Sequence, residues 1–159
     1  MRQFTDQNGN TVRLVLKGEE PFSNDPKHVW VICKYRYQWL LTTHQKRGLE
    51  FPGGKVEYGE TPLEAAHREV LEETGALIHS ITWLGQYEVA AEEERIHKNI
   101  YFAVISTLQE KDCYYETNGP VCLDALPDTI REDSRFSFVM KDDVLTYCLD
   151  YLRKEQLLK

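Results

Sequence analysis

Hydrophobic and polar positions in the first third of the chain follow the patterns of β-strands. Residues Thr11–Lys17 alternate in part between apolar and polar side chains, as expected for a strand. The continuous apolar run Val29–Cys33 indicates a buried strand, and Pro26 lies just upstream of it. Because only a short polar link separates this run from Gln38–Thr43, we expect the two segments to pair as a hairpin.

The pattern changes to that of a helix after residue 60. Thr61 can serve as the N-cap, Pro62 suits the first helical position, and Glu64 can close a capping box with Thr61. Gly75 can adopt the left-handed conformation that ends a helix. We therefore predict a helix from about Pro62 to Thr74.

The second half of the chain is predicted to hold two further strands and a terminal helix. Residues Trp83–Val89 and Ile96–Ile105 are typical of strands, and the charged run Glu92–Arg95 between them is typical of a solvated loop. Asp142 or Asp143 can cap the last helix. Apolar residues at helical spacing should turn one face of this helix toward the core: Val144, Leu145, Cys148, Leu149 and Leu152.

Composition favours a single globular domain over residues 1–159. The chain has 159 residues, of which 42% are hydrophobic and 28% charged, and we find no internal repeat or linker-like segment. Its formal net charge of −7 argues against broad electrostatic binding to nucleic acid or to anionic membranes. The apolar runs are too short to span a bilayer and Met1–Asp6 lacks a signal-peptide core, so we expect a cytoplasmic protein without a membrane partner. The four cysteines show no metal-binding or C-x-x-C spacing and are expected to be reduced thiols.

The predicted helix and the loop before it hold an unusual number of acidic residues. Six of the 26 acidic residues fall between positions 57 and 73. At about 100° per helical residue, Glu69, Glu72 and Glu73 lie within an arc of roughly 100° on one face. Like charges at this spacing repel, and a hard divalent cation such as Mg²⁺ would remove the repulsion. The alternative is an acidic helix face that is merely solvated.

Other residues around this acidic face have complementary chemistry. Arg68 lies four residues after Glu64 and four before Glu72, so it can pair along the helix. Gly53 and Gly54 could adopt positive φ and approach a phosphate or a metal, offering carbonyl oxygens as ligands. The opposite helix face is apolar and is expected to dock on a sheet through Leu63, Ala66 and Val70.

These residues resemble a known family signature. Gly54, Glu60 and the segment Arg68–Gly75 occupy the spacing of the Nudix box, here residues 54–76, with Ala76 as the one departure where a larger aliphatic residue is usual. Nudix hydrolases cleave a nucleoside diphosphate linked to another group. The chain is also similar to a group of Nudix proteins from bacilli that are regarded as nucleoside triphosphate diphosphatases, with 8-oxo-dGTP among their proposed substrates. That similarity lies in residues 26–33, 51–57, 84–87, 98–103 and 136–142.

The resemblance implies a fold and a catalytic site. The fold would be of the α/β (α+β) class, an α/β/α sandwich with a mixed β-sheet and a loop-helix-loop catalytic motif. Mg²⁺ or Mn²⁺ would be held by Glu69, Glu72 and Glu73 together with the carbonyl of Gly54 or Gly53. Glu69 would also activate the attacking water, and Arg68 would orient a catalytic carboxylate.

The same resemblance suggests roles for further acidic residues. Glu60 is expected to bond the backbone rather than to act as a base. Similar enzymes take another carboxylate from a later loop, for which we favour Glu116 as a metal ligand, with Glu92–Glu94 as competitors.

The resemblance also suggests residues for substrate binding. Gly53, Lys55 and Phe138 are candidates for contacts with the nucleotide, and Met140 and Asp142 for contacts with the edge of the base. Phe138 could stack on a purine, although aromatic residues in such positions usually belong to the core.

The expected reaction is hydrolysis of a nucleoside triphosphate to the monophosphate and pyrophosphate. Three alternatives remain open: removal of pyrophosphate from the 5′ end of a triphosphorylated RNA, hydrolysis of a nucleotide sugar or dinucleotide, and nucleotide binding without catalysis. The oligomeric state does not follow from the sequence.

Overall fold

The computed structural model describes residues 1–158, in which strands far outnumber helices. The helices are α1 (Pro62–Thr74) and α2 (Asp143–Lys154), with the 3₁₀ turns η1 (Ile130–Glu132) and η2 (Phe138–Met140). The strands are β1 (Arg2–Thr5), β2 (Thr11–Leu16), β3 (His28–Tyr35), β4 (Gln38–His44), β5 (Gly48–Glu50), β6 (Gly53–Lys55), β7 (Ala76–Ala90), β8 (Arg95–Leu108) and β9 (Thr117–Leu123).

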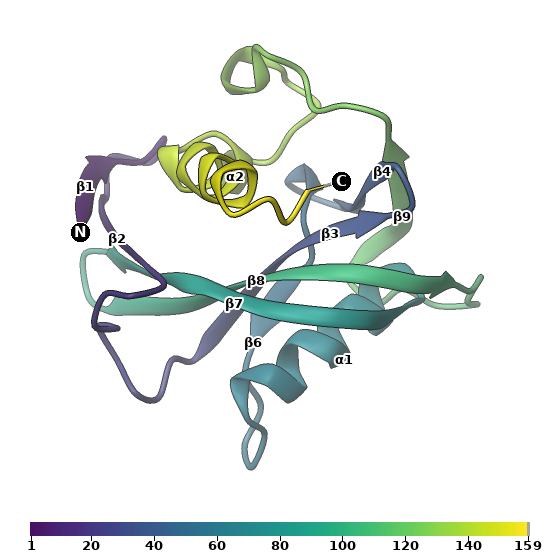
Figure 1. Cartoon of the computed structure of the whole chain (residues 1–159), viewed down its shortest axis with the longest axis horizontal. Coiled ribbons are helices and arrows are strands. Elements are labelled where there is room, and N and C mark those ends of the chain that lie inside the picture. Colours follow the sequence, from purple (N-terminus) through teal and green to yellow (C-terminus); the bar gives the residue numbers. More distant parts are fainter. Residues whose placement is uncertain (159) are drawn as a thin grey trace.

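The strands of the described chain form one mixed sheet of nine. The main order is β1-β2-β7-β8-β3-β4-β5, while β6 pairs with β3 and β9 pairs with β4. Strands β3 and β8 are parallel neighbours, and the other paired strands are antiparallel. Helices α1 and α2 lie on opposite sides of this sheet (Figure 1). The mixed sheet between two helices confirms the expected α+β sandwich.

Strand β3 connects the two halves of the core because both of its faces are covered. Trp30 and Ile32 belong to the cluster that includes buried residues of α2, whereas Val29, Val31 and Cys33 belong to the cluster under α1. The alternation of side chains along a strand therefore explains the uninterrupted apolar run in the sequence. Strands β6 and β8, which both contribute residues to the candidate active site, pair with β3.

Helix α1 begins and ends as predicted. The Thr61 hydroxyl accepts a hydrogen bond from Glu64 N at 3.1 Å, and the Glu64 carboxylate accepts one from Thr61 N at 3.0 Å. Gly75 ends the helix with a φ of 77°. Ala66 and Val70 are buried against the sheet as expected, but the expectation for Leu63 was wrong: its side chain is 45% exposed and borders an open cavity of about 500 Å³.

The other predicted elements are present at the expected positions, but the strands of the hairpin are longer than predicted. The segments 83–89 and 96–105 lie in the long hairpin β7–β8, in the parts of the two strands next to their connection, and this connection contains the expected acidic loop. Asp142 is the N-cap of α2, and its carboxylate accepts a hydrogen bond from Val144 N at 2.9 Å. The sequence did not indicate β1, β5, β6 or β9. Strands β1, β5 and β6 have only three or four residues and show too little periodicity, whereas β9 contains Gly119 and Pro120, which are unusual inside a strand. All four cysteines are free thiols.

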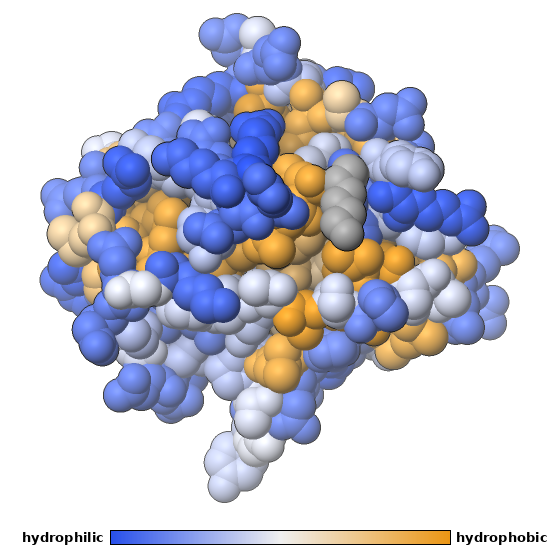
Figure 2. Space-filling view, viewed as in Figure 1, coloured by the Kyte–Doolittle hydropathy of each residue, from blue (hydrophilic) through white to orange (hydrophobic). Residues whose placement is uncertain are grey.

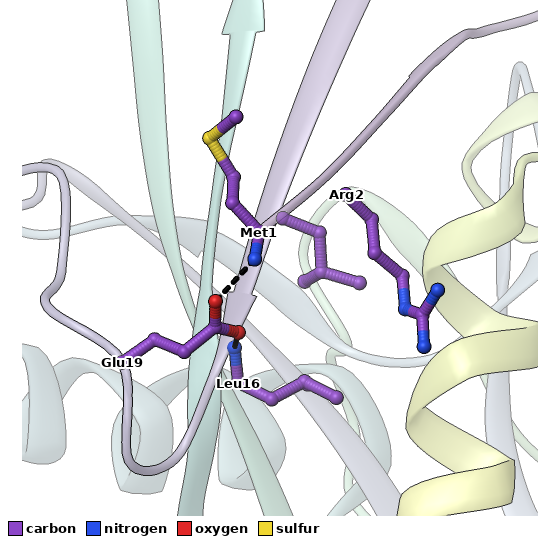
Figure 3. Close-up of a pocket in the computed structure, with 5 residues that line it drawn as sticks. Met1, Arg2, Leu16 and Glu19 are labelled. Atoms are coloured by element: carbon purple, nitrogen blue, oxygen red, sulfur yellow. Dashed lines mark hydrogen bonds and ion pairs between the residues drawn. The ribbon is translucent and has the colours of Figure 1, made fainter.

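A second cavity lies beside the amino terminus. The Met1 amino group pairs with the Glu19 carboxylate, which also accepts a hydrogen bond from Leu16 N at 3.1 Å (Figure 3). These residues border a cavity of about 310 Å³ that contains no residue of the Nudix box.

Hydrophilic side chains surround small groups of apolar residues on the face shown in Figure 2. Neither α-helix of residues 1–158 has the length and apolar character needed to cross a membrane.

The capping box predicts a measurable contribution to stability. Replacing Thr61 by alanine removes the acceptor for Glu64 N, so Thr61→Ala should lower the free energy of unfolding by about 1 kcal/mol. Urea denaturation followed by circular dichroism measures the change.

The matched control is Thr129→Ala. Thr129 precedes η1 without a capping hydrogen bond from its side chain, so the free energy of unfolding should change little. Equal losses in both variants would contradict a specific role for the capping box.

Candidate active site

One cavity of about 670 Å³ contains most of the residues that the sequence singled out. Acidic side chains of α1 line one part of it, and residues of β3, β4, β5, β6, β8 and η2 and of the loops next to them line the rest. Its lining consists of His28, Val29, Trp30, His44, Arg47, Glu50, Phe51, Gly53, Gly54, Lys55, Glu57, Arg68, Glu69, Glu72, Glu73, Lys98, Tyr115, Glu116, Phe138 and Val139.

Arg68 is the centre of the ionic network on α1. Its guanidinium donates to Glu60 and Glu69 at 2.8 Å and to Glu72 at 3.0 Å. Its Nη2 also donates to the backbone carbonyl of Lys55 at 2.9 Å. These bonds join the helix to strand β6 and to the loop between them, and they fix the directions of two predicted metal-binding carboxylates.

The structure shows which of the expected partners Arg68 and Glu60 bind. The predicted pairing of Arg68 with Glu72 is confirmed, but Glu64 uses its carboxylate in the capping box instead. Glu60 accepts a hydrogen bond from Glu57 N at 3.0 Å as well as the bonds from Arg68, so it does bond the backbone. The Arg68 bond is the main cause that lowers the pKa of Glu60.

The two glycines of β6 are required by close contacts rather than by unusual torsion angles. Neither has the positive φ that the sequence analysis expected, because both lie in a strand paired with β3. A Cβ on Gly54 would lie 2.6 Å from the carboxyl carbon of Glu69, and one on Gly53 would lie 2.5 Å from the carbonyl oxygen of Val29. Gly53 N also donates to the Glu73 carboxylate at 3.1 Å. The absent side chain of Gly54 therefore lets the Glu69 carboxylate lie directly against β6, and that of Gly53 lets β6 lie close to β3.

The carboxylates at this contact are partly removed from water. Burial raises the pKa of Glu69 to about 7, although the hydrogen bond and charge of Arg68 act in the opposite direction. Burial also raises the pKa of Glu73 to about 9, opposed by the bond from Gly53 N. Both shifts mean that negative charge here is costly without a further cation.

This donor set fits a hard divalent cation. Carboxylate oxygens and the backbone carbonyls of β6 are ligand types that Mg²⁺ and Mn²⁺ prefer. Within residues 1–158, no group of three or more acidic, His or Cys side chains is already arranged to hold a metal ion. Glu69 and Glu72 accept hydrogen bonds from Arg68, whereas Glu73 accepts one from Gly53 N. A cation would therefore bind in competition with Arg68 for carboxylate oxygens.

The later part of the chain supplies one further acidic side chain. Glu116 lies just before β9, lines the cavity, and is close enough for its charge to raise the pKa of Glu69. The competing run Glu92–Glu94 lies in the β7–β8 connection and lines no part of this cavity. This position supports Glu116 as the additional ligand, which stays a prediction.

The substrate-binding candidates divide into two groups. Gly53, Lys55 and Phe138 line the cavity, and Phe138 is 40% exposed there. The structure does not bring Met140 or Asp142 to the cavity lining. Met140 is fully buried in the core beside α2, and the Asp142 carboxylate caps that helix.

Strand pairing brings in residues that the sequence analysis missed. His28 lies opposite Lys55 on β6 and opposite Lys98 on β8. Burial, helped by these two lysines, lowers the pKa of His28 to about 4, so its imidazole is neutral near pH 7. The buried His28 Nδ1 and Trp30 Nε1 have no hydrogen-bond partner among the described residues. The sequence alone does not indicate that Lys55, His28 and Lys98 lie side by side, because their alignment depends on the register of three strands.

Comparisons with known proteins agree with this geometry. The NUDIX domain family model matches residues 22–119. The Bacillus subtilis (strain 168) protein named "Putative 8-oxo-dGTP diphosphatase YtkD" is 51% identical over 154 residues, which cover 97% of each chain. An RNA pyrophosphohydrolase of Helicobacter pylori (strain G27) is 55% identical over 38 residues, covering 24% of this chain and 23% of the relative.

A solved structure extends the similarity to the whole fold. The crystal structure of a mutant of the Bacillus subtilis pyrophosphohydrolase BsRppH matches with a TM-score of 0.97 and 49% sequence identity, and the match covers 100% of both chains. The family match spans more than half of this chain and includes the cavity wall built by β6 and α1. The chain is therefore a member of the Nudix hydrolase family, with the fold and the acidic helix of a pyrophosphohydrolase.

Proposed function

We propose that this Nudix hydrolase cleaves nucleoside triphosphates to the nucleoside monophosphate and pyrophosphate, with oxidised purine nucleotides such as 8-oxo-dGTP among its substrates. The observation that carries the proposal is the contact between the acidic face of α1 and the glycines of β6, inside a cavity that extends to Phe138. The strong similarity to the protein named as an 8-oxo-dGTP diphosphatase supports the same substrate class.

Nudix enzymes typically depend on a divalent metal ion. In this chain Glu69, Glu72, Glu73 and the carbonyl of Gly54 would hold Mg²⁺ or Mn²⁺, with Glu116 as a further ligand. Such a cation, when bound, lowers the pKa of a coordinated water and neutralises charge on the leaving phosphates.

The protein's own groups would position the reactants. Glu69 is proposed as the base that takes a proton from the attacking water, and Arg68 holds its carboxylate in place with a 2.8 Å hydrogen bond. Gly53 and Lys55 would lie along the phosphate chain, and Phe138 offers an exposed aromatic face to the base.

A second candidate substrate is the 5′-triphosphate end of an RNA. The similarity to the pyrophosphohydrolase BsRppH and the local similarity to an RNA pyrophosphohydrolase favour it. The net charge of −7 disfavours a long RNA-binding surface, but a single 5′ nucleotide does not need one.

A substrate panel tests the proposed function. With Mg²⁺ present, 8-oxo-dGTP, dGTP, GTP and ATP should each release pyrophosphate, with kcat/KM for 8-oxo-dGTP above that for dGTP. A nucleotide sugar and a 5′-triphosphorylated RNA complete the panel, and pyrophosphate and orthophosphate are measured separately. Activity confined to the RNA would select the second candidate, and cleavage of the nucleotide sugar alone would reject both.

Variants link the activity to the acidic helix. Glu69→Gln or Glu73→Gln should lower kcat by roughly 10²-fold, the usual size of a general-base or metal-ligand contribution. The matched control is Glu93→Gln, because Glu93 is exposed in the β7–β8 connection outside the cavity. Turnover near that of the wild type in both helix variants would rule out the assignment.

Cation binding should also appear without any substrate. Mg²⁺ at about 100 times its dissociation constant should raise the Tm by about 5–10 °C, since a ligand that binds only the folded state stabilises it. Differential scanning fluorimetry of the wild type and of the Glu69→Gln and Glu93→Gln variants measures the effect. We expect a smaller rise in Tm for Glu69→Gln than for the wild type and Glu93→Gln. An identical rise in all three proteins would place the cation elsewhere.

A further inference from the structure

The open cavity beside Leu63, of about 500 Å³, is separate from the candidate active site. It lies on the side of the sheet that α1 covers, where Tyr101 and Trp83 pack with buried residues of that helix. The two cavities have no lining residue in common. Lys98 lines the active-site cavity, whereas the next residue of β8, Asn99, lines the Leu63 cavity from the opposite face of the strand. The Leu63 cavity can therefore hold a ligand of its own.

A chain of hydrogen bonds with a fixed direction runs along the wall of the Leu63 cavity. Ser23 N donates to Gln86 Oε1 at 2.9 Å, and Ser23 O accepts from Gln86 Nε2 at 3.0 Å. Because a backbone N–H only donates and a carbonyl only accepts, these two bonds determine the orientation of the Gln86 amide. Gln86 Nε2 also donates to Asn99 Oδ1 at 3.0 Å, and Asn99 Nδ2 donates to the Tyr101 hydroxyl at 3.2 Å. The Tyr101 oxygen is thus an acceptor in this chain, and its hydrogen remains to be donated.

The Tyr101 hydroxyl is a donor that lacks an acceptor in the described chain. Tyr101 lines the cavity and is only 6% exposed, yet its hydroxyl donates to no group of residues 1–158. Trp83 lies opposite Tyr101 on β7 and lines the same cavity, and its indole N–H also has no acceptor among these residues. A chain of hydrogen bonds polarises its members, which strengthens the last donor. A ligand that supplies acceptors would complete the chain.

The rest of the cavity lining is uncharged and largely apolar. Among the described residues that border it, there is no Asp, Glu, Lys, Arg or His. Leu63, Ile81 and the ring of Trp83 offer apolar surface, and the Leu63 side chain is 45% exposed. Because no cation is present to pair with a buried anion, the donors of this cavity favour a neutral acceptor. A matching ligand would combine neutral carbonyl oxygens with apolar surface.

We propose that the Leu63 cavity binds an uncharged, proline-rich segment of a partner protein in the polyproline II conformation. Proline has no backbone N–H, and a polyproline II segment has no internal hydrogen bonds, so its carbonyl oxygens are free acceptors. Such segments bind to grooves lined by aromatic side chains. Here the carbonyl oxygens would accept hydrogen bonds from the Tyr101 hydroxyl and the Trp83 indole, and proline rings would pack on Leu63 and Trp83. The proposal does not depend on the proposed function, because it concerns a separate cavity.

Decaproline is a suitable probe, and the indole N–H signals of the three tryptophans report where it binds. In proton–nitrogen NMR spectra of the ¹⁵N-labelled protein, the Trp83 signal should shift and saturate as decaproline is added. Trp30 and Trp39 are internal controls, because they are 3% and 7% exposed and belong to the other core cluster. A Gly-Ser repeat peptide of equal length should cause no saturable shift, since it has no proline rings. A shift of Trp30 in place of Trp83 would locate the peptide in the active-site cavity and overturn the proposal.

Variants test the hydrogen-bond chain itself, with the dissociation constant of decaproline followed through the backbone amide signal of Asn99. Tyr101→Phe removes the last donor and keeps the ring, so the constant should rise by about 10-fold. The matched control is Tyr147→Phe, which should leave it unchanged, because Tyr147 packs against Phe4 and lies on α2 across the sheet (Figure 1).

Circular dichroism verifies that each variant is folded. Should Tyr101→Phe fail to fold, Trp83→Phe removes the other donor and is expected to weaken binding to a similar extent. The proposal is wrong if decaproline causes no saturable shift of the Trp83 signal, if the Gly-Ser peptide binds equally well, or if the folded variant binds decaproline as the wild type does.

Discussion

The bonds of the Arg68 guanidinium are the interaction on which the active site depends. Arg68 joins carboxylates of the helix, Glu69 and Glu72, to Glu60 in the preceding loop and to the backbone of β6. Without this cation, several carboxylates would face one another at a partly buried position, which raises the free energy of the folded state. Its acidic partners raise the pKa of Arg68 further above its ordinary value, so the guanidinium stays charged at any working pH. One side chain thus fixes both the shape and the charge of the catalytic wall.

Close packing at β6 imposes the second constraint. The Glu69 carboxylate occupies the space that a Cβ on Gly54 would fill, so helix and strand can approach only if this residue is glycine. The same approach removes Glu69 and Glu73 from water and raises their pKa values. Backbone contact and carboxylate chemistry are therefore two consequences of one geometry. A cation bound there would interact with groups that water solvates poorly, which strengthens electrostatic attraction.

Local sequence was sufficient to predict the catalytic helix but not the whole sheet. The start at Thr61, the stop at Gly75 and the acidic face depend on residues within a few positions of one another, and short-range hydrogen bonds determine them. Strands β5 and β6 have three residues each and exist because β4 and β3 offer them partners. The mixed sheet itself was expected only from the family resemblance. Leu63 shows the same limit, since helical phase alone did not reveal the open cavity beside it.

The candidate site divides in the same way between local and distant determinants. Residues that would hold a metal ion follow from the spacing of the Nudix box, because one helix and one adjoining strand supply nearly all of them. Residues on the other walls of the cavity come from separate strands and are matched only by register, as Lys98 is with His28. The family resemblance suggests Met140 and Asp142 for the base edge, and the structure places Met140 in the core and the Asp142 carboxylate at the cap of α2. The cavity therefore combines one wall that local sequence determines with other walls that depend on the pairing of distant strands.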